Sequence, residues 1–172
     1  TGSLNGLGGY SLAFFLAAAT AGLAILIVVP AREQARPPKA PSFKALGTLI
    51  ARRDVLLPAL LNMLSLYANW ASTYGFLPIL AKQLGATDVM QSLLVSINIA
   101  VTVLGNLFAT ALVKRTGAQR LVYASFVFLA LGIAAAALAP SLPLVFVAQI
   151  LIGLSYGGVY PVLMGMSIEH VA

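Results

Sequence analysis

The sequence contains no cysteine and a single histidine, His170, and only 8% of its 172 residues are charged. Without cysteine there are no disulfides, thiolate metal ligands or cysteine nucleophiles, and one histidine cannot form a histidine metal cluster. A soluble domain usually carries about 25% charged residues, because its surface must be hydrated. The composition therefore excludes a soluble enzyme and a disordered chain, and we expect neither a metal nor another cofactor.

In place of charge, the sequence has 60% hydrophobic residues, which lie in four charge-free stretches at 1–31, 55–81, 89–113 and 121–168. A helix needs about 20 apolar residues to cross a bilayer. The last stretch is long enough for two crossings, separated by the helix breakers of Pro140-Ser141-Leu142-Pro143. We predict an all-α polytopic membrane protein, embedded in the lipid bilayer, with about five transmembrane helices at 7–29, 56–80, 90–113, 121–139 and 143–168.

The basic residues predict the orientation of these helices. Nine of the ten Lys and Arg residues lie in the linker 30–54 and the loop 114–120, which five crossings place on the same side. Because basic loops stay in the cytoplasm, we expect both segments to be cytoplasmic in the plasma membrane. The net charge of +6 is then an orientation signal, and a nucleic-acid partner is not expected. Within the linker, residues 42–50 predict either an amphipathic surface helix or an extension of the next span.

Polar side chains mark the helix faces that meet protein or water rather than lipid. The second span has a polar face of Asn62, Ser65, Asn69, Ser72, Thr73 and Phe76, beside a strip of Tyr67, Trp70 and Tyr74. The third span aligns Gln91, Asn98, Thr102 and Asn106, and the fifth aligns Gln149, Gly153, Tyr156, Tyr160 and Ser167. Two interpretations remain open, a polar path for a solute and ordinary hydrogen bonding between helices. Our candidate substrate-binding residues are Asn62, Asn69, Trp70, Asn98, Gln149, Tyr156 and Tyr160, although Trp70 also fits an interfacial anchor.

No ionisable residue lies within the predicted spans, which argues against an ion relay or a membrane-embedded hydrolase in this part of the protein. No phosphate-binding G-x-x-x-x-G-K-[ST] loop is present, so this chain does not use ATP. In the fifth span, Gly153 and Gly157 have a G-x-x-x-G spacing shortly before Pro161, which predicts either close helix packing or a bend used in gating.

Several segments together resemble the major facilitator superfamily of secondary transporters. They are Gly75-Phe76-Leu77-Pro78, Gly85-Ala86-Thr87, the glycine-rich segment from Gly153 to Pro161, and the loop Lys114-Arg115-Thr116-Gly117-Ala118-Gln119-Arg120. This loop is similar to the family's G-x-x-x-D-R-x-G-x-R motif, which acts in conformational change. Arg115 and Gly117 match it and Arg120 lies one residue beyond its final arginine, whereas Lys114 stands at the acidic position and Thr110 at the first glycine.

The resemblance implies that the chain corresponds to helices six to ten of a twelve-helix carrier. Residues 1–29 would be the last helix of the amino-terminal bundle, 30–54 the linker between bundles, and 55–172 the first four helices of the carboxyl-terminal bundle. Since the chain begins at Thr1 and has an odd number of crossings, we expect a fragment whose partners include the remaining helices of the full-length carrier.

The function implied by the resemblance is secondary active transport of a small organic solute by alternating access, most simply by an efflux-type permease. Residues that couple transport to an ion would lie in the other helices of the carrier. The alternative is a non-transporting membrane scaffold or a subunit of a small oligomeric channel. Neither function is enzymatic.

Overall fold

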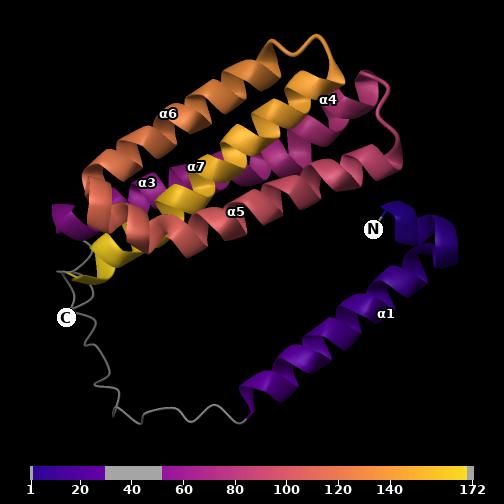
Figure 1. Ribbon diagram of the computed structural model, residues 1–172, viewed down its shortest axis with the longest axis horizontal. Helices are drawn as coiled ribbons and strands as arrows, with labels where there is room; N and C mark the ends of the chain where they lie inside the picture. Colours follow the sequence, from indigo (N-terminus) through magenta and orange to yellow (C-terminus); the bar gives the residue numbers. More distant parts are fainter. Residues whose placement is uncertain (1, 30–51, 170–172) are drawn as a thin grey trace. The chain divides into compact units, whose positions relative to one another are not determined.

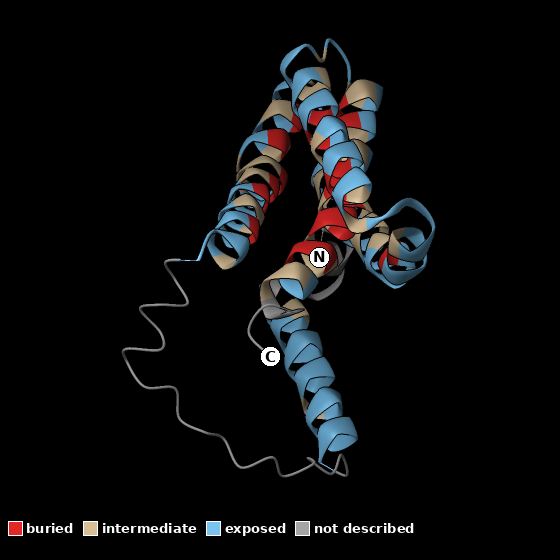
Figure 2. Ribbon diagram, turned by 90° about the vertical axis from the view of Figure 1, so that its left-hand side faces the viewer, coloured by how far each residue is buried: buried red, intermediate tan, exposed pale blue. Residues whose placement is uncertain are grey.

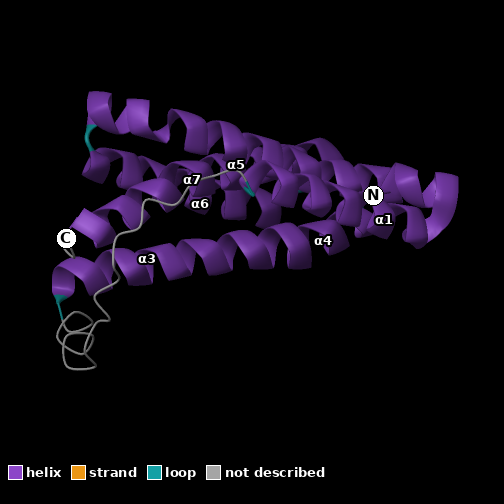
Figure 3. Cartoon of the chain, turned by 90° about the horizontal axis from the view of Figure 1, so that it is seen from below, coloured by secondary structure: helices purple, strands orange, loops and turns teal. Residues whose placement is uncertain are grey.

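The computed structural model describes residues 2–29 and 52–169, and all regular secondary structure in these ranges is helical (Figure 3). The chain divides into two compact units, Thr1–Ser42 and Phe43–Ala172. The predicted connector and the alternatives for 42–50 lie outside the described residues. Five helical segments are long and apolar enough to cross a membrane, so the predicted all-helical fold with five spans is confirmed.

The first unit contributes the helix α1 (Gly2–Val28). No residue of its apolar window from Ser11 to Val28 is buried. Phe14 and Phe15 are both 74% exposed, so this side of the helix has no packing partner within its own unit. A helix that is apolar all round is stable in a bilayer or against other helices, and not in water.

The second unit begins with one long span made of three segments, α3 (Arg53–Trp70), the π-helical η1 (Ala71–Phe76) and α4 (Leu77–Gln83). The π-turn precedes Pro78, whose ring nitrogen carries no hydrogen and cannot bond to the carbonyl one turn before it. Just before this proline, the Leu77 backbone N–H donates to the carbonyl of Ser72, five residues back, and not four residues back as in an α-helix. A π-turn accommodates one extra residue and rotates the following helix face. Phe76, at the end of this turn, is 70% exposed, whereas Ser65, Asn69 and Thr73 of the predicted polar face are buried.

Three further spans follow, α5 (Asp88–Thr116), α6 (Ala118–Ala137) and α7 (Leu142–Glu169). The hydroxyl of Thr87 caps α5 by accepting a hydrogen bond from the Met90 N–H at 3.3 Å. Gly117, with φ of 85°, alone separates α5 from α6. A side chain would be strained at this φ, which is why the chain reverses at glycine. The expected loop 114–120 is therefore a one-residue turn between two helix ends.

Helix α7 is the centre of the second unit and packs against α3, α5 and α6 (Figure 1). Half of its most apolar window is buried, compared with 17% for each of the other three spans of the unit. Buried residues face inward on all four spans (Figure 2). Two apolar clusters hold the unit together, one around Leu77, Leu94 and Ile152 and the other around Val159 and Leu163.

Glycines allow α7 to approach its neighbours closely. A Cβ built on Gly157 would lie 2.7 Å from the Thr102 carbonyl oxygen and 3.0 Å from the Cα of Gly105, both on α5. A Cβ on Gly153 would lie 3.0 Å from the carbonyl oxygen of Asn98. The G-x-x-x-G spacing therefore forms a packing surface against α5, and α7 continues as a helix through Pro161.

Candidate functional site

Most of the predicted polar faces meet at one junction between the second span, α5 and α7. Asn69, Asn98 and Gln149 are 4%, 3% and 0% exposed, and Thr73 is buried beside them. These residues come from three different spans, and periodicity alone had placed each of them on the inner face of its own helix. The tertiary structure adds that the three faces point to the same place.

Hydrogen bonds join the three spans at this junction. The Nδ2 of Asn98 donates to the Oδ1 of Asn69 at 3.3 Å and to the backbone carbonyl of Gln149 at 3.4 Å. The Thr73 hydroxyl donates to the same Asn69 oxygen at 3.4 Å. One turn further along α5, the Thr102 hydroxyl donates to the Gly153 carbonyl at 3.3 Å. Asn98 is therefore the side chain that ties α5 to both neighbouring spans.

Other buried polar atoms around the junction have no hydrogen-bond partner in the part of the chain that the structure describes. Both side-chain atoms of the Gln149 amide lack a hydrogen bond, as do the hydroxyl oxygens of Ser65 and Ser155. The Oδ1 of Asn62 and the Nε2 of Gln91 are unpaired as well. A buried polar group without a partner costs about 1–3 kcal/mol. These atoms can therefore gain from a bound water or from a polar group of a solute.

The aromatic candidates are more accessible than the amides. Tyr156 and Tyr160 on α7 are half-buried, and their ring centroids are 5.4 Å apart with a tilt of 38°. Trp70 is 59% exposed and contacts Tyr74 with ring centroids at 5.3 Å. The predicted site thus separates into buried amides, a half-buried tyrosine pair and the exposed Trp70.

The second span and α5 come together at only one end of the unit. Helix α5 contacts the second span mainly at η1 and α4, and Figure 3 shows α3 diverging from the other helices away from α4. The Asn69–Asn98 hydrogen bond lies next to the end where they meet. Asn106, two turns beyond Asn98, is exposed, so the buried part of the predicted α5 stripe does not reach it.

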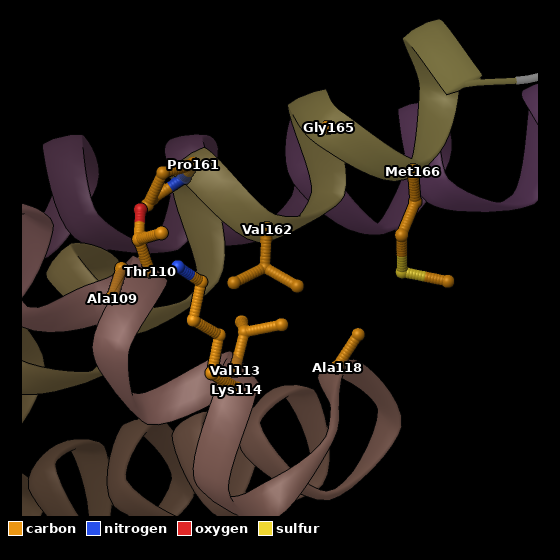
Figure 4. A pocket seen from close by; sticks show the side chains of 9 residues that line it. All are labelled: Ala109, Thr110, Val113, Lys114, Ala118, Pro161, Val162, Gly165 and Met166. Carbon is orange, nitrogen blue, oxygen red and sulfur yellow. The ribbon is translucent and has the colours of Figure 1, made fainter.

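The residues of the loop motif lie at the opposite end of α5. Lys114 and Arg115 are in its last turn, Gly117 forms the reversal and Arg120 is in the first turn of α6, and all four are exposed. Lys114 also lines a pocket of about 280 Å³ between α5 and α7 (Figure 4). Sequence reasoning missed this pocket, because its α7 wall is far away in the sequence. Basic residues at a helix C-terminus are stabilised by the helix dipole, which suits the last turn of α5.

The described residues contain no group of three His, Cys, Asp or Glu side chains that could hold a metal ion. The spans of the second unit carry charge only at their ends, at Arg53, Asp54, Lys82, Asp88, Lys114, Arg115, Arg120 and Glu169. The interior of the unit can therefore offer amides, hydroxyls and aromatic rings to a ligand.

The helices and their apolar composition define a multi-pass helical membrane protein. The model of the Major Facilitator Superfamily matches residues 1–172, and the chain belongs to this family of membrane transporters. The resemblance expected from the sequence is confirmed. Comparisons with curated proteins and with solved structures gave no significant match.

Proposed function

We propose that the protein is a secondary active transporter that moves a small organic solute by alternating access, as an efflux-type permease. The observation that carries the proposal is Gln149, a fully buried amide at the junction of three spans that has no hydrogen-bond partner among the described residues. Membrane interiors normally satisfy such groups, because water is absent there. A solute that hydrogen-bonds to Gln149 would remove this penalty.

The candidate residues have different roles in this proposal. Gln149 and Asn62 offer unpaired amide atoms to the solute, and Asn69 and Asn98 hold the three spans in register around it. Tyr156 and Tyr160 provide flat apolar surface with a polar end, which suits an aromatic or amphipathic solute. Trp70 contributes either to the solute path or to the membrane interface. A lining without charge favours a neutral solute, since a buried ion needs a partner of opposite charge.

The proposal includes a location and further partners. We place the protein in the plasma membrane, with the linker 30–54 and the Lys114–Arg120 turn in the cytoplasm. A single cysteine at Gln119 should then react with an impermeant thiol reagent only from the cytoplasmic side, and one at Thr87 only from outside. The opposite labelling pattern would refute this orientation. The substrate path would be completed by the second helical bundle that the family fold implies, and the ion-coupling residues would lie there.

Transport by the full-length carrier in vesicles tests the role of Gln149. Gln149→Met keeps the volume and apolar packing of this side chain but removes the amide, so solute uptake should fall at least tenfold, as expected from losing one buried hydrogen bond to a solute. Thermal stability in detergent should stay unchanged or rise, because an unpaired buried amide has been removed. Leu131→Met, on the exposed face of α6, is the matched control and should change neither.

Two results would contradict the proposal. Undiminished transport by Gln149→Met would show that the amide contacts only protein or water. Uptake that does not saturate with solute concentration, and no exchange of labelled for unlabelled solute, would instead indicate a channel. A carrier that alternates between two states must show both saturation and exchange.

A further inference from the structure

The pocket beside Lys114 is distinct from the polar junction and lies at the end of the unit that carries most of its basic residues. It has a volume of about 280 Å³ and lies between the end of α5 and the last turns of α7, with the start of α6 at its edge (Figure 4). Val113, Val162 and Met166 give it apolar walls, and Gly165 leaves its α7 side open. A Cβ built on Gly165 meets no atom within 4 Å.

Two polar groups from α5 enter this apolar pocket. Thr110 and Lys114 are one helical turn apart and share a face, and Figure 4 shows both side chains at the pocket wall. The described residues that line the pocket include no acidic one. None of the side chains that the structure describes forms an ion pair with Lys114, and the ion pair among them joins Arg52 to Asp54.

The pocket is located where hydrocarbon gives way to water. Lys114 is the first charged residue after the charge-free stretch 89–113, and Arg115 follows it directly. A lysine at this position places its ammonium group at headgroup level, while the residues before it remain among acyl chains. An occupant that satisfies the whole pocket therefore needs an anionic head and an apolar tail.

We propose that this pocket binds an anionic phospholipid. The headgroup phosphate would pair with the ammonium of Lys114 and accept a hydrogen bond from Thr110. The upper part of an acyl chain would lie against Val113, Val162 and Met166. Basic pockets between transmembrane helices recognise anionic lipids through this combination of charge and apolar surface. A free phosphate would use only the polar edge of the pocket and would leave its apolar walls uncovered.

The test is lipid retention by the full-length protein, purified from nanodiscs of phosphatidylcholine containing one third phosphatidylglycerol and measured by native mass spectrometry. Lys114→Gln should lower phosphatidylglycerol retention about fivefold, the effect expected from losing one basic contact near the membrane surface. Lys114→Arg should retain it. Arg115→Gln is the matched control, because it removes the same charge from the next residue, which does not line the pocket.

A second variant tests the apolar part of the pocket without changing charge. Gly165→Leu should place a side chain inside the pocket with little strain, since its first atom has free space, and should reduce retention as much as Lys114→Gln. Gly165→Ala should reduce it less. Phosphatidylcholine retention should be unchanged in every variant.

Three outcomes would overturn the proposal. Equal losses for Lys114→Gln and Arg115→Gln would show general surface attraction rather than a site. Displacement of the retained lipid by millimolar inorganic phosphate would indicate a site for a free anion. Unchanged retention in Lys114→Gln, with lower thermal stability in pure phosphatidylcholine, would mean that Lys114 pairs with a carboxylate of the protein.

Discussion

Helix α7 packs against α5 on one face and against α6 on another, and the two contacts differ at the neighbouring residues Gly157 and Gly158. Against α5, Gly153 and Gly157 bring backbone onto backbone, and side chains of α5 donate hydrogen bonds to α7 carbonyls. Against α6, the close neighbours of Gly158 belong to side chains, first of all the Ser125 hydroxyl. Backbone atoms in a helix cannot move aside, whereas a side chain can change its rotamer. The contact with α5 at Gly157 is therefore more rigid than the contact with α6 at Gly158, although α6 also approaches α7 backbone at Gly132, whose Cβ would lie 3.1 Å from the Ala148 carbonyl oxygen.

The largest effect should follow from Gly157→Ala, which inserts a methyl group into the α5 contact. Its Cβ would lie 2.7 Å from a backbone oxygen and 3.0 Å from a backbone Cα, so the two helices must separate. We expect a loss of about 2 kcal/mol in stability, measured by chemical or thermal unfolding in detergent. Gly165→Ala, two turns further along α7, is the control and should be neutral or slightly stabilising. An equal change of stability in the two variants would show that the close backbone approach at Gly157 does not make the α5 contact rigid.

A smaller effect is expected for Asn98→Ala. This change removes the hydrogen bonds that join α5 to Asn69 and to the Gln149 carbonyl. Interhelical hydrogen bonds in membranes contribute about 0.6 kcal/mol each, so the loss should be about 1 kcal/mol, and more if the vacated space stays empty. The exposed Asn106→Ala, on the same helix, should leave the unfolding midpoint unchanged. A matching loss at Asn106 would show that the measurement does not report on the junction.

The smallest effect should come from Gly158→Ala, on the α6 side. Its Cβ would meet the Ser125 hydroxyl oxygen at 2.6 Å, while its other neighbours lie at 3.8 Å. Because the hydroxyl can rotate away, the loss should stay below about 1 kcal/mol. The double variant with Ser125→Ala should recover it, as measured by a double-mutant cycle. A loss as large as that of Gly157→Ala, without recovery, would make both contacts equally rigid.

The prediction from periodicity agrees with the observed burial in regular helix, and the π-turn limits how far it can be extended along the span. Ser65, Asn69 and Thr73 were placed on one face of the second span, and all three are buried. Phe76 was placed on the same face, but the π-turn before Pro78 intervenes and the side chain is exposed. A rule of constant rotation per residue cannot anticipate an added residue in the turn.

The candidate site was only partly accessible to sequence reasoning. The amides of three spans could be listed, because polar residues are rare in apolar stretches and mark protein-facing surfaces. Their hydrogen bonds could not be foreseen, nor that Gln149 remains unpaired while its backbone carbonyl accepts from Asn98. The separation of buried amides from half-buried tyrosines depends on which neighbour covers each residue.

The sequence alone determined that this is a multi-pass helical membrane protein, where most helices begin and end, and to which family it is similar. These properties depend on the free energy of transferring residues to hydrocarbon, which composition and segment length report directly. Only the tertiary structure decided that α7 is the central helix, that three polar faces converge on Asn98, and that Lys114 borders an apolar pocket. Such contacts join residues far apart in the chain, and their geometry follows from how the helices pack. The scarcity of charge and cysteine excluded other classes of protein, and the packing of the helices brought the uncharged polar side chains together at one junction.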